Sequence, residues 1–205
     1  MPNLLALSIF PAFLIASRAN AVAEPVLVLI HNYANVDPNV LKRAEKSAAG
    51  VLSTAAVQVR WLDCPESAQA AHECQNSPDP SVLVLDLLPA GVTRRAAPHG
   101  SLGFAVPPEP GQFGSFAGVF CDRVERLSSH GYSEPVILGH AIAHEIGHLL
   151  LGPGGHSETG LMKPEWHRKE LEQAVNGTLN FDAVERARIM QNLKARVLAH
   201  TSQLR

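Results

Sequence analysis

The sequence predicts an α/β fold with a sheet of about five strands, a long central helix and a C-terminal helix. Two observations predict it. Continuous apolar runs at 25–31 and 81–88 are typical of strands buried on both faces. Stretches with apolar residues at helical spacing follow the first run and occupy the last third of the chain. A length of 205 residues with 46% apolar and 18% charged residues predicts one domain and excludes wholesale disorder.

The first 23 residues are predicted to be a signal peptide. The apolar run from Leu4 to Ala16 is shorter than the roughly 20 residues needed to span a bilayer. Ala21 and Ala23 form the small-x-small pattern of a cleavage site. We therefore expect residues 24–205 to be a single domain of an exported protein, secreted or periplasmic, with no stable membrane anchor after cleavage.

The first half of the chain predicts one helix and five strands. After the strand at 25–31, Asp37 is a good N-cap and Pro38 suits the first helical position, so a helix is expected to about residue 56. The four remaining strands are expected at 57–62, 81–88, 102–108 and 116–127, the last turning helical at its end. Prolines in 102–108 favour an edge position, where a missing N–H is tolerated.

The second half predicts three helices. A long helix is expected at about 136–151, and Gly152-Pro153 ends it. A loop follows at 152–160, then a helix at 166–175. Asn180 is predicted to cap the final amphipathic helix, about 181–198.

Three cysteines are compatible with one disulfide and one spare thiol. Cys64 and Cys74 flank a polar loop between two apolar runs, and in an oxidising compartment they are the natural pair. Closing this loop would stabilise the fold by roughly 2–3 kcal/mol in the chain-entropy description. Cys121 is then expected to be a buried free thiol.

The net charge and the histidine content restrict the possible classes of function. A formal net charge of −2 excludes an electrostatic nucleic-acid binder. Of the ten histidines, five fall between residues 140 and 167. This clustering indicates a metal site.

The centre of the cluster is His144-Glu145-Ile146-Gly147-His148, an H-E-x-x-H motif. On a helix, positions i and i+4 project both imidazoles to one side, where one divalent ion can contact both. Glu145 sits beside the first ligand, where it can take a proton from a metal-activated water. A catalytic zinc needs three protein ligands and an open position. His156 is the best third ligand, because the glycine-rich run before it lets the chain reverse.

The string HEIGHLLLGPGGHSETGLM at 144–162 resembles the metzincin clan of zinc metallopeptidases, whose pattern is H-E-x-x-H-x-x-G-x-x-H followed by a methionine-containing turn. The resemblance implies Zn²⁺ bound by His144, His148 and His156, with Met162 as the Met-turn methionine. It also implies a mixed, mostly parallel sheet whose antiparallel edge strand, 102–108, lines the substrate cleft. Here the third histidine lies eight residues after His148 instead of six.

The expected function is zinc-dependent endopeptidase activity on a peptide or protein substrate, with Glu145 as general base and the peptide extended along the edge strand. One alternative is a gluzincin-type peptidase with a downstream glutamate, Glu170 or Glu172, as third ligand. Another is a secreted zinc-binding or interaction domain without turnover. His140 is interpreted as a structural histidine near the site. Tyr132, Trp166 and His167 are interpreted as packing or surface residues.

Overall fold

The computed structural model describes residues 25–64, 74, 82–92, 100–109 and 112–203. The predicted signal peptide lies outside the described residues, as does Ser81 at the start of a predicted strand. Five strands and five helices follow one another in the order β1 (Val26–Asn32), α1 (Pro38–Ser53), β2 (Val59–Cys64), β3 (Val82–Leu88), β4 (Gly103–Ala105), β5 (Phe116–Phe120), α2 (Cys121–Ser128), α3 (Glu134–Leu151), α4 (Arg168–Val175) and α5 (Ala183–Gln203).

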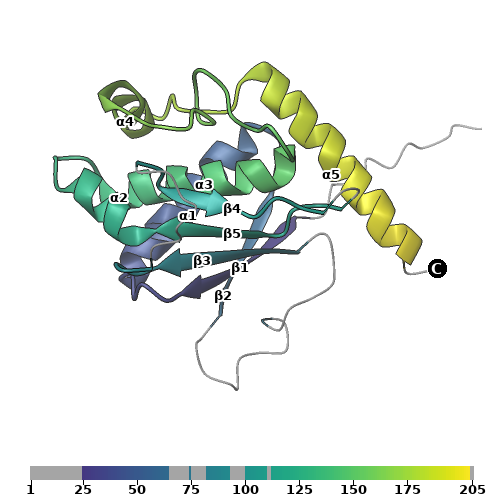
Figure 1. Cartoon of the computed structure of the whole chain (residues 1–205), viewed down its shortest axis with the longest axis horizontal. Helices are drawn as coiled ribbons and strands as arrows, with labels where there is room; N and C mark the ends of the chain where they lie inside the picture. Colours follow the sequence, from purple (N-terminus) through teal and green to yellow (C-terminus); the bar gives the residue numbers. More distant parts are fainter. Residues whose placement is uncertain (1–24, 65–73, 75–81, 93–99, 110–111, 204–205) are drawn as a thin grey trace, which may run out of the picture.

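The five strands form one sheet in the order β2-β1-β3-β5-β4 (Figure 1). Four strands are parallel, and β4 pairs antiparallel with β5 at one edge. The predicted fold class is therefore confirmed, and the proline-flanked segment does form an edge strand. It is shorter than predicted: β4 comprises Gly103–Ala105, and the backbone bonds to β5 extend only one residue beyond each end, to Leu102 and Val106.

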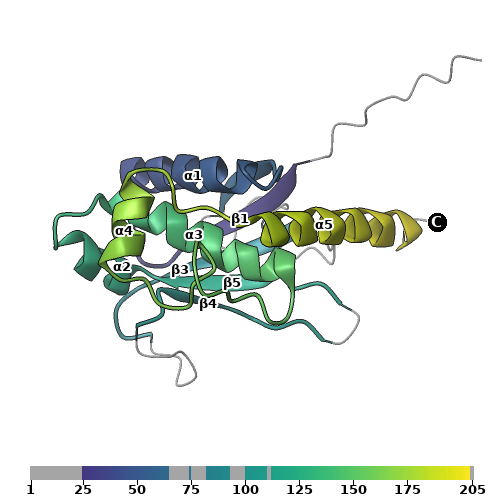
Figure 2. The same ribbon diagram turned by 90° about the horizontal axis from the view of Figure 1, so that it is seen from above.

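The main core lies between the sheet and two helices, α1 and α3, which run side by side over one face of the sheet (Figure 2). Strand residues alternate between faces. Val28 and Ile30 of β1 therefore join the helices in this core, while Leu29 belongs to a smaller cluster with Cys64 and Val82. The Asp37 carboxylate accepts hydrogen bonds from the first turn of α1, as its N-cap position predicts.

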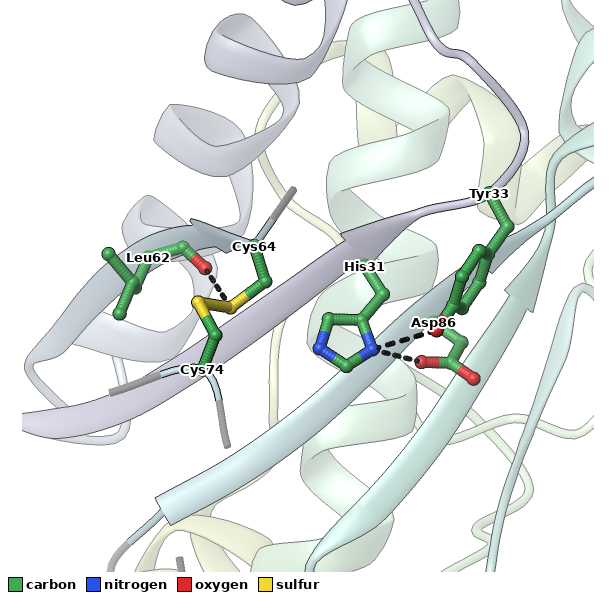
Figure 3. The surroundings of a disulfide bond; sticks show 6 residues. All are labelled: His31, Tyr33, Leu62, Cys64, Cys74 and Asp86. Carbon is green, nitrogen blue, oxygen red and sulfur yellow. Dashed lines mark hydrogen bonds and ion pairs between the residues drawn. A yellow bond between two sulfur atoms is a disulfide. The ribbon is translucent and has the colours of Figure 1, made fainter. Parts of the chain in front are cut away.

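The disulfide between Cys64 and Cys74 is present, with a Cα–Cα distance of 5.7 Å (Figure 3). Cys64 is the last residue of β2, so the bond fixes the chain where it leaves the sheet. Beside it, His31 of β1 faces Asp86 of β3, with 3.4 Å between Nδ1 and the carboxylate (Figure 3). Among the described residues, none of the helices is long and apolar enough to cross a membrane.

Several predicted boundaries differ from those of the structure: α1 ends at Ser53 instead of about residue 56, α3 begins at Glu134, α4 begins at Arg168, and α5 extends to Gln203. The second strand begins at Val59, two residues later than expected. Ala56 adopts a positive φ, so the turn after α1 is still in progress at this residue and the extended conformation starts after it. The strand predicted at 116–127 ends at Phe120, and Cys121 begins α2, where Asp122 and Arg126 form an i,i+4 ion pair. The final helix is capped by Asp182 instead of Asn180, because the Asp182 carboxylate accepts from the N–H of Glu185 at 2.7 Å.

Candidate active site

The H-E-x-x-H motif lies in the second half of α3, a helix buried over most of its length. His144 and His148 are one turn apart, and their Nε2 atoms lie 3.1 Å apart. Both imidazoles therefore project from the same side of the helix, as the i,i+4 spacing predicts.

The orientation of His144 is fixed by the segment that follows the loop. Its Nδ1 lies 2.7 Å from the carbonyl oxygen of Leu161, so Nδ1–H donates and Nε2 carries the lone pair that faces His148. The indole N–H of Trp166 donates to the same carbonyl at 3.2 Å. The Trp166 ring also meets His144 edge-on, with 5.7 Å between centroids. The Leu161 carbonyl thus fixes the tautomer of His144, and the contact with Trp166 fixes the orientation of its ring.

His156 reaches the other two histidines from the loop after α3. The helix ends at Gly152, whose φ of 73° is unfavourable for any residue with a side chain. A Cβ at Gly155 would lie only 2.9 Å from His148 Nδ1, so glycine permits the close return of the chain. The His156 ring centroid lies 4.5 Å from that of His148 and 5.7 Å from that of His144.

The three histidines are suited to hold a metal ion. One candidate ligand atom from each lies within 4.8 Å of the other two. Two nitrogens bound to one tetrahedral ion at about 2.0–2.1 Å lie about 3.3 Å apart, close to the 3.1 Å between the two helix histidines. Burial, with smaller contributions from the neighbouring histidines, lowers the pKa of His144 to about 4 and that of His148 to about 3. Burial also lowers the pKa of His156. The rings are therefore neutral at pH 7, which metal ligation requires.

Glu145 places a carboxyl group beside this cluster. Its side chain is almost fully buried, and burial raises its pKa to about 8. Its Oε2 is buried without a hydrogen-bond partner among the described residues. An unpaired buried carboxyl is costly. A cation or a polar ligand in front of it would relieve that cost.

The edge strand packs tightly against Glu145. A Cβ at Gly103 would lie 2.7 Å from both Cγ and Oε1 of Glu145 and 2.5 Å from the carbonyl oxygen of Gly118. Glycine at this position of β4 therefore lets the sheet edge approach the α3 carboxyl group, and sequence reasoning had not singled it out.

Met162 lies beneath the motif. It is fully buried, and a Cβ at Gly147 would come within 2.7 Å of its sulfur and 2.8 Å of the Phe181 ring. Gly147, the fourth residue of the H-E-x-x-H motif, thus leaves the space that the methionine and this ring fill.

His144, Glu145 and His148 of α3 line a cleft of about 840 Å³. The edge-strand segment from Gly100 to Pro108, which packs against Glu145, also lines it. The loop from Gly152 to His156 and the segment from Lys163 to Trp166 form the remaining walls. A cleft of this volume is in the range of ligand sites.

Other predicted candidates lie outside the histidine cluster. His140 is buried, its Nδ1 bonds the carbonyl of Val136 at 2.8 Å, and its Nε2 has no hydrogen-bond partner among the described residues. Glu170 pairs with Lys163 Nζ at 2.8 Å and also accepts the His167 N–H. Glu172 pairs with Arg168 at the surface. Neither glutamate is among the described groups that could hold a metal.

Trp166 has a larger role than sequence reasoning gave it, since it both lines the cleft and contacts His144. A tryptophan closely following the predicted ligand loop was the only available signal. The Leu161 carbonyl could not have been found from sequence, because every residue carries one.

The chain matches no known protein-family description, and no curated protein matches it in sequence. Its fold is similar to that in the crystal structure of a zinc-dependent peptidase from Methanocorpusculum labreanum (strain Z), with a TM-score of 0.53. The two share 17% sequence identity, and the similarity covers 79% of this chain and 99% of the other. At this identity the likeness concerns the fold.

Proposed function

We propose that the protein is a zinc-dependent peptidase in which His144, His148 and His156 hold the ion and Glu145 is the general base. The observation that carries the proposal is the convergence of three neutral imidazoles in one cleft with the buried carboxyl group of Glu145, whose Oε2 has no hydrogen-bond partner among the described residues. The similarity in fold to a protein described as a zinc-dependent peptidase supports it.

Peptide hydrolysis at this site would need both the ion and side chains of the protein. When bound at a three-histidine site, zinc lowers the pKa of a coordinated water toward 7 and polarises a carbonyl group. Glu145 takes a proton from the attacking water and returns it to the leaving amine. Burial alone raises the pKa of Glu145 to about 8, which would leave the group largely protonated at pH 7. The positive charge of a bound ion would lower this pKa and so make the carboxylate available as the base. Leu161 holds His144 in the ligating tautomer.

The edge strand offers a template for an extended peptide. At the two ends of β4, the Leu102 carbonyl accepts from the Phe120 N–H and the Val106 N–H donates to the Phe116 carbonyl. Because hydrogen-bonding directions alternate along a strand, the N–H and C=O groups of Gly103 and Ala105 point away from β5. A substrate strand pairing with these two residues would place its backbone alongside Glu145.

We also propose that the peptidase is of the metzincin type, with Met162 as its Met-turn methionine. The order of the motif residues and the position of the buried sulfur against Gly147 support this type. Residues 24–205 would form one exported domain after removal of residues 1–23. The disulfide is compatible with export into an oxidising compartment.

The test is peptide hydrolysis by Glu145→Gln and His156→Ala, with and without a chelator, on casein and a broad peptide library. We expect Glu145→Gln to retain zinc and to lose about 10²–10⁴-fold in kcat. His156→Ala should bind zinc more weakly. His130→Ala, at an exposed histidine outside the cleft, is the matched control and should behave like the wild type. Undiminished hydrolysis by Glu145→Gln would refute the mechanism. Zinc binding without turnover of any peptide would favour the inactive zinc-binding domain.

A further inference from the structure

The loop that brings His156 to the cluster is exposed and contains neither helix nor strand. Between His148 and His156 it is also two residues longer than the metzincin pattern. A longer loop loses more conformational entropy when its end is fixed. Contacts from elsewhere in the fold would therefore be needed to hold the His156 imidazole in one place.

The first such contact lies immediately after the ligand. The Ser157 hydroxyl donates to Glu185 Oε1 at 2.6 Å, a length typical of a charge-assisted hydrogen bond. Glu185 belongs to the first turn of α5 and is 7% exposed. Its second oxygen accepts the Asp182 N–H at 2.7 Å. The helix cap thus fixes the carboxylate, and the carboxylate fixes Ser157.

The second contact lies before the ligand. Arg188 donates from Nη2 to the Pro153 carbonyl at 2.9 Å. Glu185 and Arg188 are three positions apart and therefore lie on the same side of α5. The loop is held on both sides of His156 by one helix, which begins 27 residues farther along the chain. Farther along, α5 passes the end of α3, where Asn192 donates to the Leu150 carbonyl; the two helices are drawn in Figure 2.

We propose that Glu185 and Arg188 are positioning residues for the metal ligand His156. Together they form a clamp from α5 that holds the loop in the ligating geometry before the ion arrives. The clamp rests on the proposed function, since it is defined by a histidine proposed to bind zinc. It assigns to the C-terminal helix a role in metal affinity, through residues that touch neither the ion nor the substrate.

The test compares clamp variants with controls that alter the same helix without touching the loop. Glu185→Ala removes the bond to Ser157 and half of the helix cap. Asp182→Ala removes the other half of the cap and leaves the loop contact in place. Ser157→Ala cuts the same bond from the loop side, together with the 2.9 Å contact of this hydroxyl with the Thr159 carbonyl. Arg188→Gln is matched by Arg186→Gln, at an exposed neighbour on α5.

Three measurements are made on the full chain. Zinc affinity is obtained by competition with a chelator, and coordination from the visible absorption spectrum of the Co²⁺-substituted protein. Hydrogen exchange of residues 152–160 is followed in the metal-free protein. We expect Glu185→Ala, Ser157→Ala and Arg188→Gln to weaken zinc binding about 10-fold or more, to change the Co²⁺ spectrum and to speed exchange in the loop. Asp182→Ala and Arg186→Gln should match the wild type in all three.

The outcomes separate the two proposals. Wild-type affinity and loop exchange in Ser157→Ala and Arg188→Gln would overturn the clamp while leaving the three-histidine site intact. Equal losses in Asp182→Ala and Glu185→Ala would also overturn it, because cap stability alone would then explain the effect. If the wild-type protein binds no zinc, or His156→Ala binds it as tightly as the wild type, the proposed site itself fails.

Discussion

Replacing Gly103 by alanine tests the contact between the sheet edge and the proposed general base. The added methyl group would lie 2.5 Å from the Gly118 carbonyl oxygen and 2.7 Å from Cγ and Oε1 of Glu145. The first of these neighbours is backbone within the same sheet and cannot rotate away. β4 must therefore shift relative to β5, and Glu145 must also move unless the same shift relieves its contact with the methyl group.

The structure sets the size of the effect. Ordinary van der Waals contact begins at about 3.4 Å, so β4 must move by about 1 Å to accept the methyl group. Overpacking of this kind costs about 1–3 kcal/mol of stability. A shift of about 1 Å in a reacting group can lower the rate about 10²-fold. Zinc affinity should change little, because the three histidines lie on α3 and its loop.

The assay combines urea denaturation, zinc content and kcat/KM on a cleaved peptide, measured on Gly103→Ala and on a control. Gly50→Ala is the control, since its Cβ would meet nothing within 4 Å. In the interior of α1 it should stabilise the protein by about 0.5–1 kcal/mol and leave hydrolysis unchanged. If Gly103→Ala folds with normal zinc content and keeps kcat/KM within twofold of the wild type, the reasoning is refuted.

Two further predictions concern stability. Burial, and then repulsion and hydrogen bonding with Asp63, raise the pKa of Glu45 to about 7, against a weaker opposing effect of Lys42. The folded state therefore holds a proton that the unfolded state releases, so stability should fall as pH rises from about 4.5 to 7, by about 1 kcal/mol once solvent screening is allowed for. Glu145, whose pKa is also raised, adds a loss in the same direction, so Glu45→Gln should reduce the difference in stability between urea melts at pH 5 and 8 by about this amount. An unchanged difference would contradict the assignment. Replacing Cys64 and Cys74 together by serine should cost about 3 kcal/mol, the entropy of closing their short loop, and a loss below about 0.5 kcal/mol would mean that the bond constrains little.

The motif could be predicted because its geometry is local. Positions i and i+4 of a helix share a side whatever surrounds them, so the pairing of His144 with His148 follows from sequence alone. The end of α3 was equally predictable, since Gly152 adopts the positive φ that its position after the last helical turn suggests. The apolar runs predicted the strands for the same reason, because their pattern depends on few neighbours.

Boundaries were less predictable where two local tendencies compete. The run from Phe116 is apolar enough for a strand, yet the segment beginning at Cys121 carries Asp122 and Arg126 at helical spacing. Whether a residue of this segment is strand or helix depends on whether β3 extends far enough to pair with it. The last residue of β3 pairs with Phe120, so the strand ends there. Likewise Asp182 competes successfully with Asn180 as a cap, because Glu185 returns a bond to its backbone.

The sequence by itself determined the α/β class, the helix that presents His144, Glu145 and His148, and the candidate third ligand. Each of these depends on the spacing of residue types within a short stretch of the chain. Only the tertiary structure decided that β4 meets Glu145 at Gly103, and that α5 holds the His156 loop through Glu185. These contacts join residues tens of positions apart. Their existence depends on how whole elements pack, because a close approach is set by the volumes of both partners and not by the periodicity of either.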